Sequence, residues 1–429
     1  MPNQTRLRPG TPSLLRELND RAALRLLLDG RSLTRSQLSE LTGVSKVTVA
    51  QMLARLEDRG LVAAVGEQAG GRGPNATLYS VVPSSAYVAG LYVEHGEVNT
   101  AVADVTGKVI AEVREDAFGA GDPVELVRSA VDRACARAGV AVESLSAFVI
   151  GSPGVVDPRT GDPWLAINLP EWHEGVLEGL RGALRKPVLI ENDVNLAAIA
   201  ERADGAAAGL DDFVLLWIGV GIGLATVLGG RLHRGASGAA GEIGWLPVPG
   251  APLTPDVRRP AGGGLQWLAG AEPVRVLAGQ YGYGGLRAGA AVGAAVRDAG
   301  AAVSSPHESL TGSASPASSS DPGAGAARAT AGPGAARATA FLDELAHRVA
   351  LGATAVCAVL DPGLVVLGGE VGLAGGQALA ERVAAEVRHM CPVRPQVVPT
   401  AVSSQPVLRG ALITAVDQAR TDLLGSVAG

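Results

Sequence analysis

The hydrophobic positions of the first 82 residues follow helical spacing and then a strand pattern. Leucines and alanines between residues 14 and 27 recur three or four residues apart, which predicts an amphipathic helix ending near Gly30. Two shorter helices are predicted over residues 35–42 and 45–59, with a turn at Gly43 between them. Two strand-like runs then enclose a polar, glycine-rich tip. This order predicts a winged helix-turn-helix domain over residues 1–83.

From residue 84 the pattern changes to β-rich runs that alternate with helices and end in loops bearing Gly, Asn or Asp. Open α/β folds build ligand clefts from such strand ends, so we predict an α/β domain over residues 84–429. Residues 214–228 form the longest apolar run, which is too short to span a membrane and is expected to be buried core. Residues 285–340 consist mainly of Ala, Gly, Ser and Pro and are predicted to be a disordered insert.

Charge is divided unevenly along the chain. The first 82 residues hold ten Arg and one Lys against seven acidic residues, which gives them a net charge of +4. Since the whole chain carries −6, the remaining residues carry −10. A basic module attached to an acidic one points to nucleic acid as a partner. The three cysteines, Cys135, Cys357 and Cys391, are far apart and form no CxxC pair. With no apolar segment behind the N-terminal arginines, this predicts a cytoplasmic protein without disulfides or a cysteine metal site.

The second helix of the motif is expected to lie in the major groove of double-stranded DNA. Ser45 would cap this helix, and Lys46, Thr48 and Gln51 would face bases near its start. Arg55 and Arg72 would contact phosphates, or the minor groove for Arg72 in the wing. The alternative is a three-helix bundle used for protein contacts. The turn glycine, the serine cap, the wing and the local charge together favour DNA.

Polar side chains also follow two β-rich runs of the second domain. Asp193 closes one run with Asn192, and a carboxylate there can act as a general base on a hydroxyl group while the amide orients the substrate. The alternative is helix capping by Asn192 or Asp193 without chemistry. Glu242 lies in a second glycine-flanked turn, and Asn168 adds another amide. Carboxylates and amides suit polyol recognition, because each sugar hydroxyl both donates and accepts.

Five segments in chain order carry a family resemblance: GSPGVVDPRTG, NLPEW, ENDVNLAAIAE, GVGIGLATVLGGRLHRGASGAAGEIGW and LDPGLVVLGGEV. They are similar to the ROK family of bacterial repressors and sugar kinases. With a winged helix in front, the chain resembles the regulator branch, which includes repressors of xylose and N-acetylglucosamine genes. The resemblance implies an actin-like, hexokinase-like (ribonuclease-H-like) domain of two lobes, at about residues 84–200 and 201–429, with a sugar cleft between them.

The resemblance also implies roles for single residues. Asn192, Asp193 and Glu242 match sugar-binding positions, and Asp193 matches the catalytic base of the kinases. Gln266 stands where the family has a sugar-binding Glu, and Trp245 stands where it has a zinc-ligating His. The expected effector-binding set is Asn168, Asn192, Asp193, Glu242, Trp245 and Gln266.

The departures from the family pattern predict lost cofactors. Family kinases hold ATP phosphates on a DxGGT loop, whereas this chain has Glu94 there, and its charge would repel a polyphosphate. The second phosphate loop has Val220 in place of a threonine, and the family's zinc-binding cysteines are missing. We therefore expect no zinc, no ATP and no enzymatic activity, with Asp193 as a vestigial base.

Together these features predict a repressor of sugar or related metabolite genes that binds a DNA operator as a homodimer or homotetramer, without a membrane segment. Two alternatives stay open. One is an ATP-dependent sugar kinase with Asp193 as the base. The other is a regulator whose second domain binds no ligand and only oligomerises.

Overall fold

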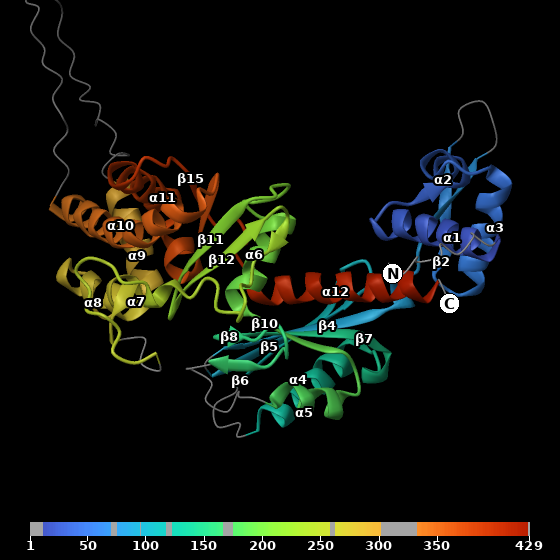
Figure 1. The fold of residues 1–429 in the computed structure, drawn as a ribbon, viewed down its shortest axis with the longest axis horizontal. Helices are drawn as coiled ribbons and strands as arrows, with labels where there is room; N and C mark the ends of the chain where they lie inside the picture. The colour runs from blue at the N-terminus through green and yellow to red at the C-terminus, as the bar shows by residue number, and fades with distance from the viewer. Residues whose placement is uncertain are drawn as a thin grey trace, which may run out of the picture. The chain divides into compact units, whose positions relative to one another are not determined.

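The computed structural model describes residues 12–69, 75–94, 96–116, 122–165, 175–257, 262–301 and 333–427 (Figure 1). The chain divides into two compact units. The first unit contains residues 1–200 and 405–429, and the second contains residues 201–404. Each unit is described below by itself.

The N-terminal part of the first unit is a winged helix-turn-helix domain, as predicted. Its small sheet has the order β1-β3-β2, with all neighbouring strands antiparallel. Leu24, Leu27, Leu38 and Leu53 are fully buried and form its core, whereas Leu18, expected on the packed face of the first helix, is exposed. The elements are α1 (Pro12–Leu28), β1 (Leu33–Thr34), α2 (Arg35–Thr42), α3 (Lys46–Asp58), β2 (Val62–Gln68) and β3 (Ala76–Val81).

The rest of the first unit is lobe I, which is built on a five-stranded sheet of order β10-β7-β4-β5-β6. β4 pairs in parallel with β7 and antiparallel with β5, so the sheet is mixed. Helices α4 and α5 lie on one face, and α12 lies on the other (Figure 1). The bounds are β4 (Tyr87–Glu94), β5 (Glu97–Asp104), β6 (Val109–Asp116), α4 (Pro123–Ala138), β7 (Leu145–Ser152), α5 (Val176–Leu184), β10 (Val188–Asn192) and α12 (Pro406–Ser426), with a small hairpin of β8 (Val155–Val156) and β9 (Pro163–Leu165).

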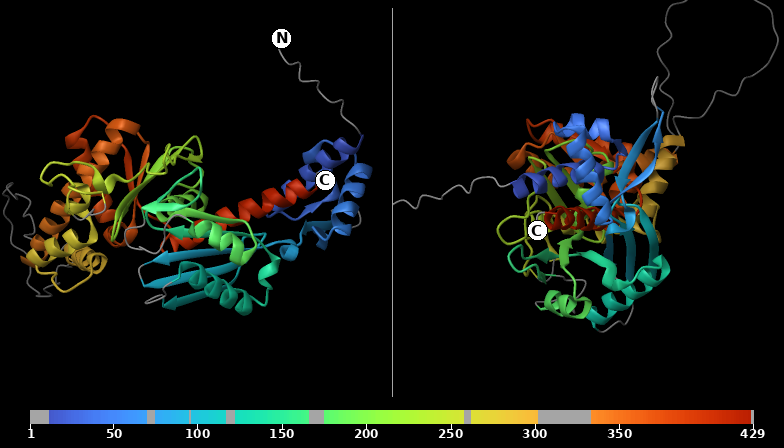
Figure 2. Two further views of the ribbon diagram at one scale, coloured as in Figure 1. Left: turned by 60° about the horizontal axis from the view of Figure 1, so that its bottom comes forward. Right: turned by 90° about the vertical axis from the view of Figure 1, so that its right-hand side faces the viewer.

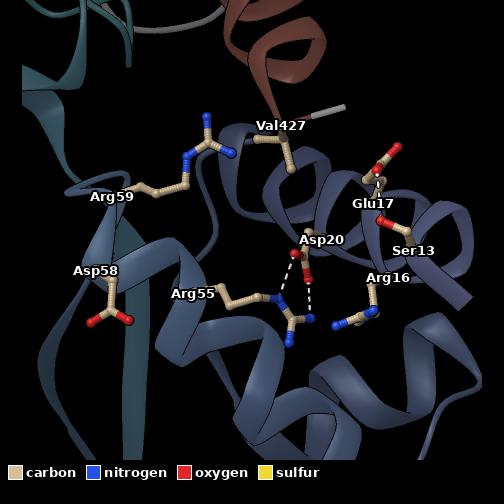
Figure 3. A pocket seen from close by; sticks show the side chains of 8 residues that line it. All are labelled: Ser13, Arg16, Glu17, Asp20, Arg55, Asp58, Arg59 and Val427. Atoms are coloured by element: carbon tan, nitrogen blue, oxygen red, sulfur yellow. Dashed lines mark hydrogen bonds and ion pairs between the residues drawn. The ribbon is translucent and has the colours of Figure 1, made fainter. Parts of the chain in front are cut away.

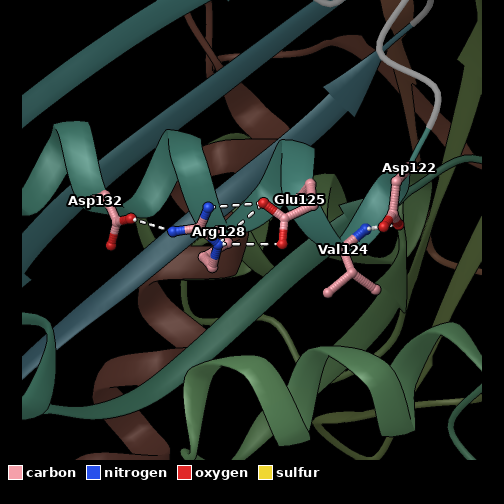
Figure 4. Close-up of polar contacts among 5 residues, drawn as sticks. All are labelled: Asp122, Val124, Glu125, Arg128 and Asp132. Carbon is pink, nitrogen blue, oxygen red and sulfur yellow. Dashed lines mark hydrogen bonds and ion pairs between the residues drawn. The ribbon is translucent and has the colours of Figure 1, made fainter.

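Helix α4 shows why its sequence is helical. Asp122 caps the N-terminus by accepting a hydrogen bond from the backbone N–H of Val124 at 2.9 Å. On the exposed side, Arg128 pairs with Glu125 and Asp132, one turn away in each direction (Figure 4). The pairing with Arg128 lowers the pKa of Glu125.

The C-terminal helix corrects the predicted extent of lobe II. The prediction assigned residues 201–429 to that lobe, but α12 packs on the sheet of lobe I. Gly410 allows this close approach to α6 (Asp193–Asp204), because a Cβ atom there would lie 1.9 Å from the carbonyl oxygen of Leu196. The chain therefore returns to lobe I at Gln405.

Lobe II has a second five-stranded sheet, of order β13-β12-β11-β14-β15. The apolar run at residues 214–228 covers two adjacent antiparallel strands and the turn between them, and most of it is buried, as predicted. Helices α9, α10 and α11 pack against one another beside this sheet (Figure 2). The bounds are β11 (Phe213–Ile218), β12 (Ile222–Leu228), β13 (Arg231–Leu232), the 3-10 turn η3 (Ile243–Trp245), α7 (Gly264–Ala269), α8 (Ala271–Gln280), α9 (Ala288–Ala301), α10 (Pro333–Leu360), β14 (Leu364–Gly368), α11 (Gly369–Met390) and β15 (Gln396–Pro399).

The prediction of a disordered insert at residues 285–340 was wrong at both ends of this range. Helix α9 occupies residues 288–301, and α10 already begins at Pro333. Ala291, Ala295 and Ala338 are fully buried in the core of lobe II. Alanine is the best helix former, and its small side chain allows close packing between helices, so low complexity here does not mean disorder. The middle of the predicted insert lies outside the described residues.

Candidate functional site

The turn between α2 and α3 is fixed by capping at both sides. Gly43 adopts a left-handed conformation (φ 72°) and donates a backbone hydrogen bond to Ser39 at 3.0 Å, which ends α2. Ser45 begins α3, and its hydroxyl accepts a hydrogen bond from the backbone N–H of Thr48 at 3.2 Å. The Ser45 and Thr48 hydroxyl oxygens also lie 2.9 Å apart and share a hydrogen bond. Both hydroxyl groups thus take part in capping the helix.

Helix α3 has one buried and one exposed face. Val49, Met52, Leu53 and Leu56 are fully buried and form one apolar stripe along the helix. Lys46 and Gln51, two of the predicted base-contacting residues, lie on the exposed face. The sequence analysis missed Val47, whose side chain is 70% exposed. Its signal was present in the sequence, because Val47 lies out of phase with the buried apolar positions.

Arg55, predicted to contact phosphates, is paired within the protein. Its guanidinium donates two hydrogen bonds to the carboxylate of Asp20 in α1, at 2.8 and 2.6 Å (Figure 3). This bidentate pairing raises the pKa of Arg55, mainly through the hydrogen bonds from its side chain. Asp20 is buried, so the pair holds α3 against α1. Arg72 lies outside the described residues.

The winged helix also contacts the last turn of α12, within the first unit. Arg59, directly after α3, donates a hydrogen bond to the carbonyl oxygen of Ser426 at 3.0 Å. An open cavity of about 360 Å³ lies beside this contact, between α1, α3 and the end of α12 (Figure 3). Its lining combines three arginines with three carboxylates: Ser13, Arg16, Glu17, Asp20, Arg55, Asp58, Arg59 and Val427. The charges are balanced there, which does not distinguish an anionic from a cationic ligand.

The candidate effector residues of lobe I are held by internal hydrogen bonds. Asn192 donates from its side chain to the carbonyl oxygen of Gly154 at 2.9 Å and accepts from the backbone N–H of Asn195 at 3.0 Å. Asp193 accepts from the backbone N–H of Val194 at 2.8 Å. This is the capping arrangement expected for the alternative interpretation of these residues. Both side chains remain half-buried.

Gln266 in lobe II supports a glycine turn. Its side-chain oxygen accepts from the backbone N–H of Ile222 at 2.8 Å, and its side-chain nitrogen donates to the carbonyl oxygen of Val220 at 2.9 Å. The amide therefore spans the turn between β11 and β12. A glutamate could not donate the second of these bonds.

The other candidates in lobe II belong to the turn around η3. Glu242 precedes η3 and is half-buried, and Trp245 ends it. The indole nitrogen of Trp245 is buried, and it has no hydrogen-bond partner among the described residues. The structure thus brings Glu242, Trp245 and Gln266 into one unit and Asn192 and Asp193 into the other, while Asn168 lies outside the described residues.

Glu201 is a further residue that the sequence analysis missed. Its side chain is fully buried and accepts hydrogen bonds from the backbone N–H groups of Ala206 at 2.7 Å and Val402 at 3.2 Å, and from the hydroxyl of Thr400. The carboxylate thus ties α6 to the segment after β15, near both points where the chain passes between the units. No sequence pattern signals the bonds to Thr400 and Val402, because these partners are about 200 residues away.

The residues present do not fit a zinc site of the family type. Zinc in proteins is held by Cys, His or carboxylate ligands in close tetrahedral geometry. Residues 246–266, which follow η3, contain neither Cys nor His. Across the described part of the chain, no group of three or more His, Cys, Asp or Glu is placed to hold a metal ion. Within the same residues, no helix is long and apolar enough to cross a membrane.

The fold and the site residues define a class: a winged helix-turn-helix protein with an actin-like, hexokinase-like α/β domain of two lobes. The chain belongs to the ROK family, whose model matches residues 90–418. A MarR family model matches residues 18–73, which cover most of the winged helix.

Curated relatives include proteins named as transcriptional repressors and regulators. The xylose repressor of Caldicellulosiruptor bescii is 27% identical over 241 residues, covering 55% of this chain and 60% of the relative. The "DNA-binding transcriptional dual regulator NagC" of Escherichia coli K12 is 24% identical over 248 residues, covering 56% and 59%. The chain thus matches about 60% of the length of these relatives.

Solved structures share the fold. A ROK family transcriptional regulator, described as a homologue of the E. coli MLC protein, has a TM-score of 0.68 at 17% identity, over 96% of this chain and 99% of its own. A ROK hexokinase from Thermus thermophilus has a TM-score of 0.56 at 26% identity, over 76% and 97%. The regulator match extends across nearly the whole chain, including the winged helix.

Proposed function

We propose that this protein is a DNA-binding transcriptional regulator, a repressor whose ROK domain senses a sugar or a sugar derivative. The observation that carries the proposal is the capped helix-turn-helix, with an exposed face on α3, joined in one chain to a ROK domain. The relatives named xylose repressor support the same function. The proposed site of action is double-stranded DNA in the cytoplasm, bound by a homodimer or homotetramer.

Helix α12 is the proposed route from the sensing lobes to the DNA-binding domain. It begins directly after Gln405, where the chain returns from the second unit, and it ends at the contact between Arg59 and Ser426. An effector that binds one arrangement of the lobes better than another shifts the population towards that arrangement. A shift in the segment before Gln405 then reaches the winged helix through α12. In a dimer, this changes the spacing of the two recognition helices.

The proposed effector residues are Asn192, Asp193, Glu242, Trp245 and Gln266, with Asn168 as a further candidate. Amides and carboxylates of this kind suit sugar hydroxyls. Asn192, Asp193 and Glu242 are half-buried, so each residue is partly accessible to solvent. We propose no zinc and no nucleotide as cofactors.

The test is a binding titration with the full-length protein. A labelled duplex from the region upstream of its own gene is titrated at low salt, with unrelated DNA as competitor. We expect binding in the nanomolar range that weakens steeply as salt rises. The titration is then repeated with hexoses, amino sugars, xylose and their phosphates, of which one should change the affinity. No preference for any upstream duplex over unrelated DNA would contradict the DNA-binding part.

A sugar kinase is the second candidate function, because the ROK hexokinase shares the fold and Asp193 stands at the matched base position. Two features of the chain argue against it. Strand β4 continues to Glu94, which pairs with Glu97 across a tight hairpin where the kinases have a phosphate-binding loop. Val220, in the turn between β11 and β12, exposes an apolar side chain where the kinases have a threonine. Sugar-dependent ATP turnover that Asp193→Asn abolishes would establish the kinase instead.

A further inference from the structure

The exposed side of α3 carries a stripe of small and apolar side chains interrupted by one amide. Val47, Gln51 and Ala54 are all exposed and lie four and three residues apart, so they share one face of the helix. The four buried residues of α3 lie on the opposite side. Val47 is 70% exposed in the first turn, which is the part of a recognition helix that contacts base edges.

Two hydroxyl groups and one guanidinium group near this stripe have internal partners. The hydroxyls of Ser45 and Thr48 bond to each other, and Ser45 also caps the helix. Arg55 is held by the carboxylate of Asp20. The stripe is therefore poor in hydroxyl and guanidinium groups that could bond to guanine, the base most often read by arginine.

Each base pair presents a distinct pattern in the major groove. Thymine alone projects a methyl group at its C5 position, which apolar side chains contact, and adenine presents N7 and N6 to the two ends of a glutamine or asparagine amide. Val47 supplies methyl groups and Gln51 supplies an amide with both a donor and an acceptor. Neighbours one turn apart are roughly 6 Å from each other, a distance that spans one or two base steps of about 3.4 Å.

We propose that α3 reads an A·T-containing step of the operator, with Val47 against a thymine methyl and Gln51 on an adenine one or two base pairs away. This rests on the proposed function, since it requires that the chain binds DNA. It adds the sequence preference of the bound site and assigns Val47 as a specificity-determining residue. Lys46, at the edge of the exposed face, adds positive charge beside the stripe.

The experiment starts from duplexes selected out of a random-sequence library by the full-length protein. Each thymine of the selected site is replaced in turn by deoxyuridine, which removes only the C5 methyl. We expect a loss of about fourfold in affinity at one or two positions, the value for one buried methyl group. Each adenine is likewise replaced by 7-deazaadenine, which removes the N7 acceptor.

The variants link these losses to single side chains. Val47→Ala should bind the unmodified duplex about fourfold more weakly and lose nothing further at the sensitive deoxyuridine position. Gln51→Ala should do the same at the sensitive adenine. Val47→Thr keeps the side-chain shape but replaces one methyl by a hydroxyl. This variant controls for weaker binding that arises from a loss of folding in Val47→Ala. Matched controls are Val359→Ala and Gln377→Ala, both exposed in lobe II, which should behave as wild type throughout.

The outcomes separate this inference from the proposed function. If Val47→Ala keeps the full sensitivity to deoxyuridine, or if wild-type protein shows no sensitive thymine in a tightly bound site, the assignment of Val47 is overturned while DNA binding stands. If no duplex is enriched by selection, the proposed function falls, and this inference falls with it.

Discussion

The recognition helix and the candidate effector site use their polar residues in different ways. On α3, the capping hydroxyls and Arg55 are engaged with the protein, while Lys46, Val47 and Gln51 face outward. The candidate effector residues Asn192 and Asp193 of lobe I and Gln266 of lobe II all take part in capping a helix or supporting a turn. The winged helix thus presents a surface, whereas the polar groups of the lobes first stabilise their own backbone.

Polar side chains that stabilise the protein's own backbone thus differ from polar side chains that are exposed to a partner. A side chain with strong internal bonds positions its surroundings, and any ligand must add to these bonds or replace them. An exposed side chain on a rigid helix is available to a partner at no such cost. The exposed face of α3 is therefore open to a partner, whereas a ligand at the candidate effector residues must compete with bonds inside the protein.

The largest effect should come from filling the turn before η3. Gly241 has φ 99°, and a Cβ atom there would lie 1.8 Å from the carbonyl oxygen of Leu224. We expect Gly241→Ala to lower the free energy of unfolding of lobe II by about 3 kcal/mol, measured by denaturant titration. The matched control is Gly250→Ala, which also has positive φ (83°) but open space around it, and should cost only about 1 kcal/mol. Equal costs would contradict a close backbone contact at Gly241.

A smaller loss of stability is expected when the amide of Gln266, which supports the turn between β11 and β12, is changed. Gln266→Glu removes the hydrogen bond to the carbonyl oxygen of Val220 and should lower the free energy of unfolding by about 2 kcal/mol at neutral pH. Denaturant titration measures this cost, and hydrogen exchange at Ile222 reports whether the turn opens. Gln377→Glu, at an exposed position, serves as the control. A stability unchanged from wild type would mean that Gln266 is free for a ligand.

The pair between Arg55 and Asp20 sharpens the comparison within the winged helix. A double-mutant cycle of Arg55→Ala and Asp20→Ala should give a coupling free energy of about 1 kcal/mol in unfolding.

DNA titrations at several salt concentrations test the two basic residues of α3 separately. Lys46→Ala should reduce the slope of log affinity against log salt concentration by about one unit, and Arg55→Ala should leave this slope unchanged. A reduced slope for Arg55→Ala would instead place Arg55 on a phosphate, as the sequence analysis expected.

The smallest effect concerns thiol reactivity. Burial raises the pKa of Cys135 and of Cys357 to about 11, so about one thiol in a thousand is ionised at pH 8. Cys391 is only half-buried. A disulfide reagent at pH 8 should therefore label one thiol per native chain quickly, and Cys391→Ala should remove that phase. Rapid labelling of two or three thiols would show that the cores of the lobes open.

The sequence alone predicted what depends on local pattern. The winged helix, the buried core at residues 214–228 and the ROK fold follow from periodicity, turn residues and motifs. The bond between Arg55 and Asp20 and the assignment of α12 to lobe I depend on contacts between residues distant in sequence, which no local pattern encodes. Composition misled at α9, because a run of alanines is both low in complexity and strongly helical.

Hydrogen exchange of the full-length protein with and without a selected duplex tests the account most directly. The account predicts slower exchange on DNA binding in peptides that cover the turn before α3 and the α3 helix itself. Peptides that cover Asn192, Asp193 and Gln266 should show no comparable protection from DNA alone. Protection confined to the lobes, with α3 unchanged in a saturated complex, would contradict the claim that this helix is the DNA-reading surface.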